Sequence, residues 1–471
     1  MEEKNPILIL GLSFLVGVLL TSSGTKGYAI VVGYSVLIAL MSISQKIGLI
    51  PKNLFSLRTI IILSFPAIIL GIFYYSFYVN FQDIRNDAPV NKEISLGGLI
   101  VSDPKISNNY QLATVEIDGG EKITVITELS PILSYGDRIT LSGKITDRRN
   151  PNELPAIVFP DVEITSRGNG FFLKKFLINF KNHLVENFKL FLPPDPAALM
   201  SGITLGHRSN FTPEFKNMMA LSGTTHIVAL SGYNIAILII AIGATLGNFI
   251  SRRKTFFVTA AIIILFVTMT GGEASIIRAA IMGLLFLLAK ELGRPHNTSN
   301  AIVIAAVIMT IVKPTLIFYD IGFQLSFLAL LGIIHLKPVI DKLLSLDRKA
   351  VGFLNWKENA STTLSAQLVV APVIVNNFHQ FSLSAIPANI LILEIIPFTM
   401  FMGFTLAFVG LLSQFAGIII AKISAILLGY QTLIIKIFSH LAIPIGNLFE
   451  AGVVILIYYF ILLGLVIKFH R

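Results

Sequence analysis

The 471-residue sequence contains no cysteine, and only 13% of its residues are charged. Without cysteine the chain has no disulfide, no thiolate metal site and no cysteine nucleophile. Its eight histidines form no His-x-His or His-Glu-x-x-His group, which argues against a zinc hydrolase. A glycine-rich phosphate loop is also missing, so nothing indicates nucleotide-driven transport by this chain. We therefore expect no metal ion and no cofactor.

Hydrophobic residues make up 54% of the chain, and the mean hydropathy is +0.78. This composition is typical of a polytopic α-helical membrane protein, for which we predict about 12 spans. Three predicted spans lie near the N-terminus, at about 7–22, 28–43 and 59–79, and the first is interpreted as a retained span rather than a signal peptide. Nine more follow residue 197, at about 227–250, 255–270, 275–290, 300–318, 321–336, 361–378, 386–411, 413–438 and 450–468. The run at 413–438 contains Lys422 and Lys436 and could instead lie on the membrane surface.

Changes in the length and spacing of the apolar runs divide the sequence into four segments. Residues 1–80 hold the N-terminal spans, 91–166 a small all-β domain, 168–196 an interfacial helix with its linker, and 197–471 the main membrane domain. Within 91–166, short alternating runs between turn residues predict five strands, at about 93–101, 110–117, 121–128, 138–146 and 156–165. Five short antiparallel strands favour an OB-like barrel, with a small β-sandwich as the alternative.

The predicted barrel is acidic, although OB barrels that bind single strands use a basic groove with stacking aromatic residues. Residues 91–166 contain seven basic and eleven acidic residues, and few aromatic ones. A scaffolding or gating role is therefore at least as consistent with the composition as strand binding.

Residues 171–192 form a predicted amphipathic helix. Apolar residues recur at steps of three and four along one face, at Leu173, Leu177, Phe180, Leu184, Phe188 and Phe191. Four lysines lie off this face, at Lys174, Lys175, Lys181 and Lys189. This pattern favours a helix that lies on the bilayer surface and joins the barrel to the membrane domain.

The distribution of Lys and Arg predicts the orientation, because basic loops accumulate on the cytoplasmic side. The loops at 45–58 and 337–357 and the C-terminal end are basic and should face the cytoplasm. The N-terminus is then also inside, and the barrel at 91–166 lies outside. Part of the formal net charge of +10 reflects these loops rather than a binding surface.

The stretch from Leu221 to Ile235 places several polar groups at the boundary of a predicted span. His226, Ser231 and Asn234 are its candidate path residues, beside three further hydroxyl side chains. A polar group in the bilayer costs a few kcal/mol unless it has a partner, so such clustering favours a water-filled cavity or a substrate path. The alternative is that Ser, Thr and Gly here only pack one helix against another.

The stretch from Gly271 to Gly283 carries the second constellation. Ser275, Ala279 and Gly283 recur every fourth residue, a small-residue stripe that allows close helix packing. Arg278 lies about one turn into the same predicted span, where a charge indicates function by default. The alternative interpretation is that the Arg278 side chain extends to the lipid head groups of the outer leaflet.

Asp320 and Gln324 open another predicted span and share one face at a spacing of four residues. Asp320 either pairs with Arg278 or acts as an ordinary helix cap, and the sequence leaves both open. Because all three constellations begin at turns predicted to lie outside, His226, Ser231, Asn234, Arg278, Asp320 and Gln324 are expected to line one cavity beneath the barrel.

The repeated Ala-Leu-Ser-Gly at 220–223 and 229–232 resembles the nucleophile turn of a serine hydrolase. The glycine that should precede the nucleophile by two residues is alanine in both copies, so we predict no enzymatic activity.

Four motifs in order resemble the core of the ComEC family of competence membrane channels. They are Met200-Ser-Gly-Ile-Thr-Leu-Gly-His207, the stretch from Leu221 to Asn234, Ser275-Ile-Ile-Arg-Ala-Ala-Ile-Met-Gly283 and Phe318-Tyr-Asp-Ile-Gly-Phe-Gln-Leu-Ser-Phe-Leu-Ala329. The order of the segments is also similar to that of the family. The resemblance implies a multi-pass protein of a prokaryotic cytoplasmic membrane that passes single-stranded DNA during natural transformation.

Many members of that family continue into a metallo-β-lactamase-like domain, whose metal motif this chain lacks. The resemblance therefore implies that a separate nuclease, a DNA receptor and a cytoplasmic motor are partners, besides the lipid bilayer. The alternative function is a secondary transporter for a small anionic solute, which inverted repeats would favour. A third possibility is a scaffold in an envelope assembly that conducts nothing.

Overall fold

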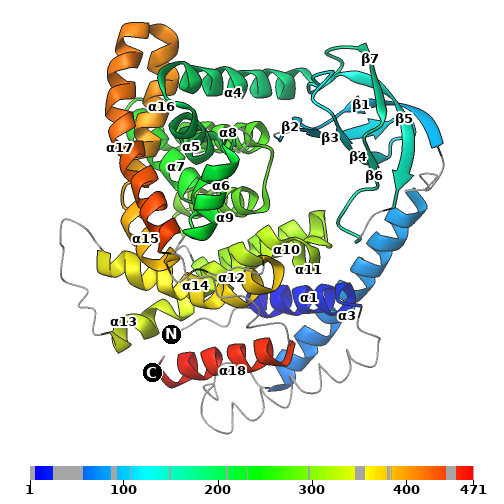
Figure 1. The fold of residues 1–471 in the computed structure, drawn as a ribbon. Coiled ribbons are helices and arrows are strands. Elements are labelled where there is room, and N and C mark those ends of the chain that lie inside the picture. The colour runs from blue at the N-terminus through cyan, green and yellow to red at the C-terminus, as the bar shows by residue number, and fades with distance from the viewer. Residues whose placement is uncertain are drawn as a thin grey trace.

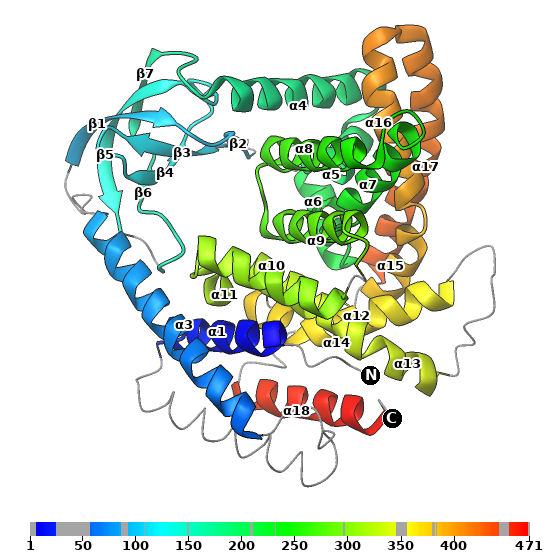
Figure 2. The same ribbon diagram turned by 180° about the vertical axis from the view of Figure 1, so that it is seen from behind.

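The computed structural model describes residues 6–24, 57–85, 93–107, 109–147, 150–207, 211–230, 232–294, 297–344, 356–378, 382, 384–441 and 452–469. The predicted span at 28–43, most of the loop at 45–58 and Ser231 lie outside these residues. Figures 1 and 2 show a β domain joined to a larger helical body.

The N-terminal helices α1 (Pro6–Ser22) and α3 (Leu57–Arg85) pack closely against each other. Glycines make this possible: a Cβ atom on Gly17 would stand 2.2 Å from the carbonyl oxygen of Ile68, and one on Gly71 would stand 2.3 Å from that of Phe14. Small residues allow two helix backbones to approach in this way in membrane proteins.

The β domain contains seven strands: β1 (Glu93–Ile100), β2 (Lys105–Ile106), β3 (Gln111–Ile117), β4 (Lys122–Thr127), β5 (Arg138–Thr146), β6 (Ala156–Val158) and β7 (Asp161–Ser166). Five of them close a barrel in the order β1, β3, β4, β6, β5, with β5 pairing back to β1. All of these pairs are antiparallel except β4 with β6. This order is consistent with the predicted OB-like fold.

The first four predicted strands coincide with β1, β3, β4 and β5 to within about two residues, and the fifth is divided. The predicted strand at 156–165 becomes β6 and β7, which pair with different neighbours. Phe159, with a φ of 50°, and Pro160 stand at the break. Both features interrupt a continuous ladder, because a side chain is strained at positive φ and proline has no N–H to donate.

Helix α4 (Phe172–Phe191) leads from the barrel along one side of the helical body, as both ribbon views show. Its buried face packs against α5 (Pro194–Leu205), α8 (Arg252–Thr270) and α16 (Ile396–Leu412). Two of its lysines do not face outward as the amphipathic pattern predicts. Lys174 donates to the Val101 carbonyl oxygen over 2.7 Å, and Lys181 is buried.

The remaining elements are α6 (Pro213–Leu221), η1 (Thr225–Val228), α7 (Gly232–Leu246), α9 (Ala274–Glu291), α10 (Thr298–Val312), α11 (Leu316–Tyr319), α12 (Ile321–His335), α13 (Lys337–Leu343), α14 (Trp356–Phe378), α15 (Ala385–Leu393), α17 (Gln414–His440) and α18 (Gly452–Phe469). The largest core runs from α4 through α9 to the helices α15, α16 and α17.

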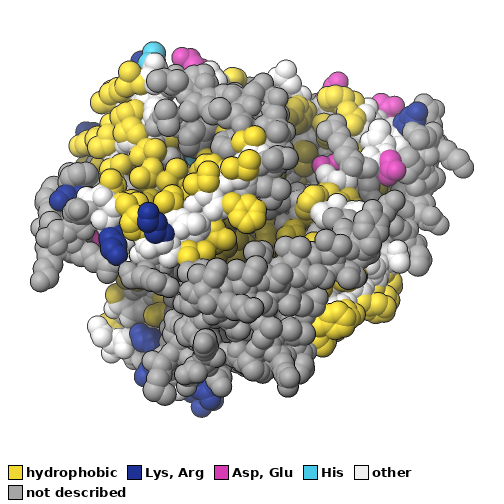
Figure 3. Space-filling view, turned by 90° about the horizontal axis from the view of Figure 1, so that it is seen from below, with side chains coloured by type: hydrophobic (Ala, Val, Ile, Leu, Met, Phe, Trp, Pro, Cys, Tyr) yellow, Lys and Arg dark blue, Asp and Glu magenta, His cyan; other side chains and the backbone are white. Residues whose placement is uncertain are grey.

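Three of the described helical segments are long and apolar enough to cross a bilayer: Ser64–Gln82, Arg252–Thr270 and Gln414–His440. Two bent pairs raise this number to five if each pair is one span, α12 with α13 at 44° and α15 with α16 at 52°. The described surface seen in Figure 3 carries broad hydrophobic patches with scattered Lys and Arg side chains. The structure is thus that of a helix-rich membrane protein, and several shorter apolar helices such as α7 and α10 stand where further spans are predicted.

One contact bears on the predicted orientation. Asn187 of α4 donates to the carbonyl oxygens of Leu406 and Ala407 in α16, at 3.2 and 3.1 Å. The Phe191 ring lies against Gly410 and Gly417, on either side of the turn between α16 and α17. Strict alternation of the predicted spans puts this turn in the cytoplasm, whereas α4 is predicted on the outer surface. Since the two lie side by side, α4 on the outer surface is incompatible with the strict alternation that puts this turn in the cytoplasm.

Helix α18 supports the proline in α14. Pro372 has no N–H, so it cannot donate to the Leu368 carbonyl four residues earlier. The Tyr458 hydroxyl donates to that oxygen over 2.7 Å, and Tyr459 donates to the Val369 carbonyl over 2.9 Å. α18 therefore replaces a hydrogen bond that α14 cannot make for itself.

Candidate functional site

Arg278 is the centre of the candidate site. It lies in α9, and its guanidinium reaches the neighbouring helix α12, where Nη1 donates to the carbonyl oxygen of Ser326. Its guanidinium carbon lies 5.7 Å from the centre of the Phe327 ring, a cation–π distance. The Nε atom is buried and has no partner among the described residues. One buried donor of this half-buried charged side chain is thus left without a partner among the described residues.

Arg278 also meets the start of α7. A Cβ atom on Gly232 would stand 4.0 Å from Nη2 of Arg278 and 3.6 Å from Cβ of Ala279. Gly232 belongs to the motif around Asn234, and Ser326 belongs to the motif around Asp320. The three sequence motifs therefore meet at Arg278 through Gly232 and Ser326, which were not among the predicted path residues.

The small-residue stripe of α9 faces two helices. A Cβ atom on Gly283 would stand 2.9 Å from Ile239 and 3.2 Å from Ile235, both in α7. On the other side, the Ser326 hydroxyl of α12 donates to the Ser275 hydroxyl over 3.2 Å. This packing fixes the backbone from which Arg278 extends.

Asn234 is buried, and its side chain forms a hydrogen bond with the neighbouring helix α5. Its Nδ2 donates to the Ile203 carbonyl oxygen over 2.8 Å. Ile203 lies in the last turn of α5, where Gly206 ends the helix in a left-handed conformation and the His207 N–H donates to Ser201 instead. Carbonyls of a last helical turn have no partner within the helix. Asn234 supplies one, so it ties α7 to α5 rather than facing an open path.

His226 and Ser222 behave differently within the same motif. The residue His226 is exposed on the short helix η1. The Ser222 hydroxyl is fully buried and shares a 2.8 Å hydrogen bond with the Thr224 hydroxyl. Gly223 between them has a φ of 66°, and a Cβ atom there would stand 2.3 Å from Ala385 of α15. This turn therefore requires glycine.

Asp320 and Gln324 make contacts within their own turn. Asp320 is the N-cap of α12 and accepts from the Phe323 N–H over 2.6 Å. Gln324 donates to the Phe318 carbonyl oxygen over 2.5 Å, at the end of α11. Asp320 and Arg278, both among the described residues, form no ion pair. Of the two alternatives that the sequence leaves open for Asp320, the structure shows the helix cap.

Besides the hydrogen bond from Lys174 to Val101, two contacts that the sequence did not reveal attach the barrel to the helical body. Lys181 of α4, with 8% of its side chain exposed, pairs with Asp103 of the barrel over 2.5 Å. The second contact is the turn between α10 and α11, where Lys313 and Thr315 bind the Asn152 backbone and side chain at 3.1 and 3.0 Å. This contact puts the 313–320 turn beside the barrel, in agreement with the prediction that both lie on one side.

His207 lies at the end of the motif that begins at Met200, close to the first of these attachments. Burial, and then the positive charge of Lys181, lower the pKa of His207 to about 4, while Asp103 acts in the opposite direction. His207 is therefore neutral at physiological pH. It was part of a motif but not a predicted site residue, and its charged neighbours lie 26 and 104 residues away in the sequence.

Among the described residues, no group of His, Cys, Asp and Glu could hold a metal ion.

Comparison with known proteins gives two findings. A family model described as "Competence protein" matches residues 203–471. "ComE operon protein 3" of Bacillus subtilis (strain 168) is 28% identical over 234 residues, which are 49% of this chain and 28% of that protein. The match thus spans little more than a quarter of the relative's length. No solved structure matches the chain.

Proposed function

The chain belongs to the ComEC family of competence proteins, and on that premise we propose that it acts in DNA uptake, as a channel that passes one DNA strand across the cytoplasmic membrane. The observation that carries the proposal is the junction of α7, α9 and α12 at Arg278, a half-buried arginine whose buried Nε–H has no partner among the described residues.

The chemistry of this junction suits a phosphate that passes rather than stays. A buried donor without a partner costs about 1–3 kcal/mol, and more when the group is charged, so a phosphate oxygen or a water beside it is favoured. The other contacts of Arg278 are a carbonyl oxygen and an aromatic ring, which hold the guanidinium without neutralising it. Conduction needs contacts that are favourable enough for entry and weak enough for release. A single partly satisfied arginine meets both needs.

The barrel is proposed to lie outside the cell and to cover the entrance. The barrel is attached through Asn152 to the 313–320 turn, which leads directly into the start of α12. Ser326 lies only a few residues beyond that start. Because the barrel carries more acidic than basic residues, it would repel rather than hold a strand. A gating or scaffolding role follows from this charge.

The proposed partners are single-stranded DNA, the lipid bilayer and separate proteins that act as DNA receptor, nuclease and cytoplasmic motor. The chain itself is proposed not to cut DNA. This proposal rests on the sequence, in which the eight histidines form no His-x-His or His-Glu-x-x-His group.

A secondary transporter for a small anion is the second candidate. The two bent helix pairs, α12 with α13 and α15 with α16, favour it, since transporters place binding sites at interrupted helices. In that case Arg278 would hold a solute in a closed site.

Site-specific cross-linking separates these functions, because the chain has no native cysteine and single cysteines can be introduced cleanly. Ser275→Cys places a thiol beside Ser326, and Ile264→Cys in α8 is a control on an exposed apolar position. A DNA strand with a bulky end and thiol-reactive backbone groups would be stalled during uptake. Cross-linking at residue 275 but not at residue 264 is expected, and its absence at both positions would contradict a path beside Arg278.

A further inference from the structure

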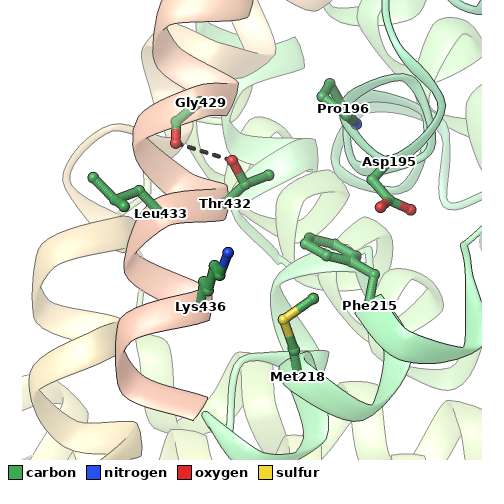
Figure 4. A pocket seen from close by; sticks show the side chains of 8 residues that line it. All are labelled: Asp195, Pro196, Phe215, Met218, Gly429, Thr432, Leu433 and Lys436. Carbon is green, nitrogen blue, oxygen red and sulfur yellow. Dashed lines mark hydrogen bonds between the residues drawn. The ribbon is translucent and has the colours of Figure 1, made fainter. Parts of the chain in front are cut away.

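A pocket lies between α5, α6 and α17, and none of the described path residues lines it. Its volume is about 410 Å³, within the usual range of about 300–1,000 Å³ for small-molecule sites. Its lining consists of Asp195, Pro196, Phe215, Met218, Gly429, Thr432, Leu433 and Lys436, shown in Figure 4. An apolar wall with one cationic and one anionic side chain is its defining feature.

The pocket borders an apolar outer surface. α17 is one of the three long apolar helices, and its outward residues Ile426, Leu433 and Ile437 are 74%, 54% and 43% exposed. Isolated exposed apolar residues are ordinary, but a stripe of them along a helix able to cross a bilayer indicates contact with lipid chains. Since Leu433 belongs both to this stripe and to the pocket, a lipid molecule can reach the pocket from the bilayer.

Lys436 supplies the cation. It is exposed, and its amine has no hydrogen-bond or ion-pair partner among the described residues. In Figure 4 the amine points into the space between α17 and the Phe215 and Met218 side chains. The helix ends four residues later at His440, about 6 Å further along its axis. That position corresponds to the head-group level of a spanning helix, where an unpaired lysine attracts a phosphate.

Asp195 supplies the anion. Its Oδ1 accepts from the Thr212 N–H and hydroxyl at 3.4 and 3.1 Å, which holds the start of α6. Its second carboxylate oxygen has no partner among the described residues, and it forms no ion pair with Lys436. The two opposite charges therefore line one pocket without neutralising each other. A ligand that carries both a negative and a positive group complements them.

We propose that this pocket binds the head group of a zwitterionic phospholipid that carries a primary ammonium group, such as phosphatidylethanolamine. Lys436 contacts the phosphate, the free oxygen of Asp195 accepts from the ammonium, and Phe215, Met218 and Leu433 contact the glycerol and the first acyl carbons. A DNA strand is a poorer occupant, because it has phosphates but no ammonium and meets the Asp195 carboxylate. The site is independent of the proposed DNA path.

Lipid retention by the purified full-length chain tests the site. The detergent-solubilised protein is incubated with equal amounts of isotope-labelled phosphatidylethanolamine and phosphatidylglycerol, and the retained lipids are counted by native mass spectrometry. We expect several-fold enrichment of phosphatidylethanolamine. Equal retention of the two lipids would overturn the proposal.

Three variants assign the contacts. Lys436→Gln should lower retention of both lipids several-fold. Asp195→Asn keeps the oxygen that binds Thr212 and should remove only the preference for phosphatidylethanolamine. Lys422→Gln, at an exposed position of the same helix, should change neither. Equal effects of Lys436→Gln and Lys422→Gln, at matched thermal stability, would show that the lysine acts only as a general surface charge.

A soluble competitor identifies the source of the head group. Free phosphoethanolamine has the same two charges but no acyl chains. We expect it to displace the lipid only at concentrations at least a hundredfold higher, and displacement at concentrations equal to the lipid's would contradict a lipid site.

Discussion

The Nη1 atom of Arg278 donates to the backbone carbonyl oxygen of Ser326, so the charge in α9 is held by the main chain of α12 rather than by a carboxylate. A carbonyl dipole orients the guanidinium but leaves its full positive charge in place. An ion pair with Asp320 would have cancelled much of that charge. This difference makes the junction suitable for an anion that passes, and several predictions depend on the contacts around it.

Asn234 is expected to be a stability residue. In Asn234→Leu the Ile203 carbonyl at the end of α5 loses its partner, which should cost about 1–3 kcal/mol of unfolding free energy. Thermal unfolding of the purified protein measures this. Thr245→Val in the same helix is the control. The exposed Thr245 hydroxyl donates only within its own helix, so its removal should change stability little. Equal stability of the Asn234→Leu variant and the unaltered protein would refute the capping role.

Lys181 is expected to hold the barrel against α4. Lys181→Met leaves Asp103 without its partner, which should loosen the barrel and speed cleavage of the Gly168–Gly170 linker by added protease several-fold. Lys189→Met is the matched control, because Lys189 pairs with Glu186 on the exposed side of the same helix. If both variants are cleaved at the rate of the unaltered protein, the ion pair does not attach the barrel.

Protonation of His207 should lower the stability of the folded protein in acid. The pKa of this histidine is lowered from 6.5 to about 4 in the folded protein, so below pH 6.5 the unfolded state binds more protons than the folded state. Stability should therefore fall as the pH drops from about 6.5 to about 4. His207→Gln should flatten this dependence in thermal unfolding measured across that range, and an unchanged pH profile in the variant would exclude His207 as its source.

The two adjacent tyrosines of α18 provide an internal comparison. Tyr458→Phe leaves the Leu368 carbonyl without any donor, because Pro372 cannot supply one, and should cost about 1 kcal/mol of unfolding free energy. Tyr459→Phe should cost less, since the Val369 carbonyl faces the N–H of Val373 within α14. Thermal unfolding of the two single variants compares them, and the reverse order would show that α18 does not support the proline.

Local patterns in the sequence predicted the local structure well. The alternation and turn residues of 93–146 located four barrel strands, and the apolar spacing of 171–192 located α4 to within a residue. The division of the fifth strand needed the backbone conformation of Phe159, which no periodicity encodes. The burial of Lys181 could not be predicted either, because its partner Asp103 lies 78 residues away in the sequence.

The candidate site was also predictable only in part, because its contacts join residues that are far apart in the sequence. Arg278 and the small-residue stripe were visible as a charge and a spacing within one helix. Their partners are a glycine and a backbone carbonyl, Gly232 and Ser326, which carry no chemical signature in a sequence. Asp320 and Gln324 looked like path residues because a helix cap and a channel lining use the same side chains.

Import of labelled DNA by cells that express Arg278 variants at equal levels tests the central claim most directly. Arg252→Ala, which removes an exposed arginine at the other end of the α8–α9 pair, is the control and should import normally. Arg278→Lys should import in part, because lysine keeps the charge but loses the planar fork that can bind a carbonyl and a phosphate together. Arg278→Ala should abolish import although the protein is folded and inserted. Normal import by Arg278→Ala would contradict a DNA path beside Arg278.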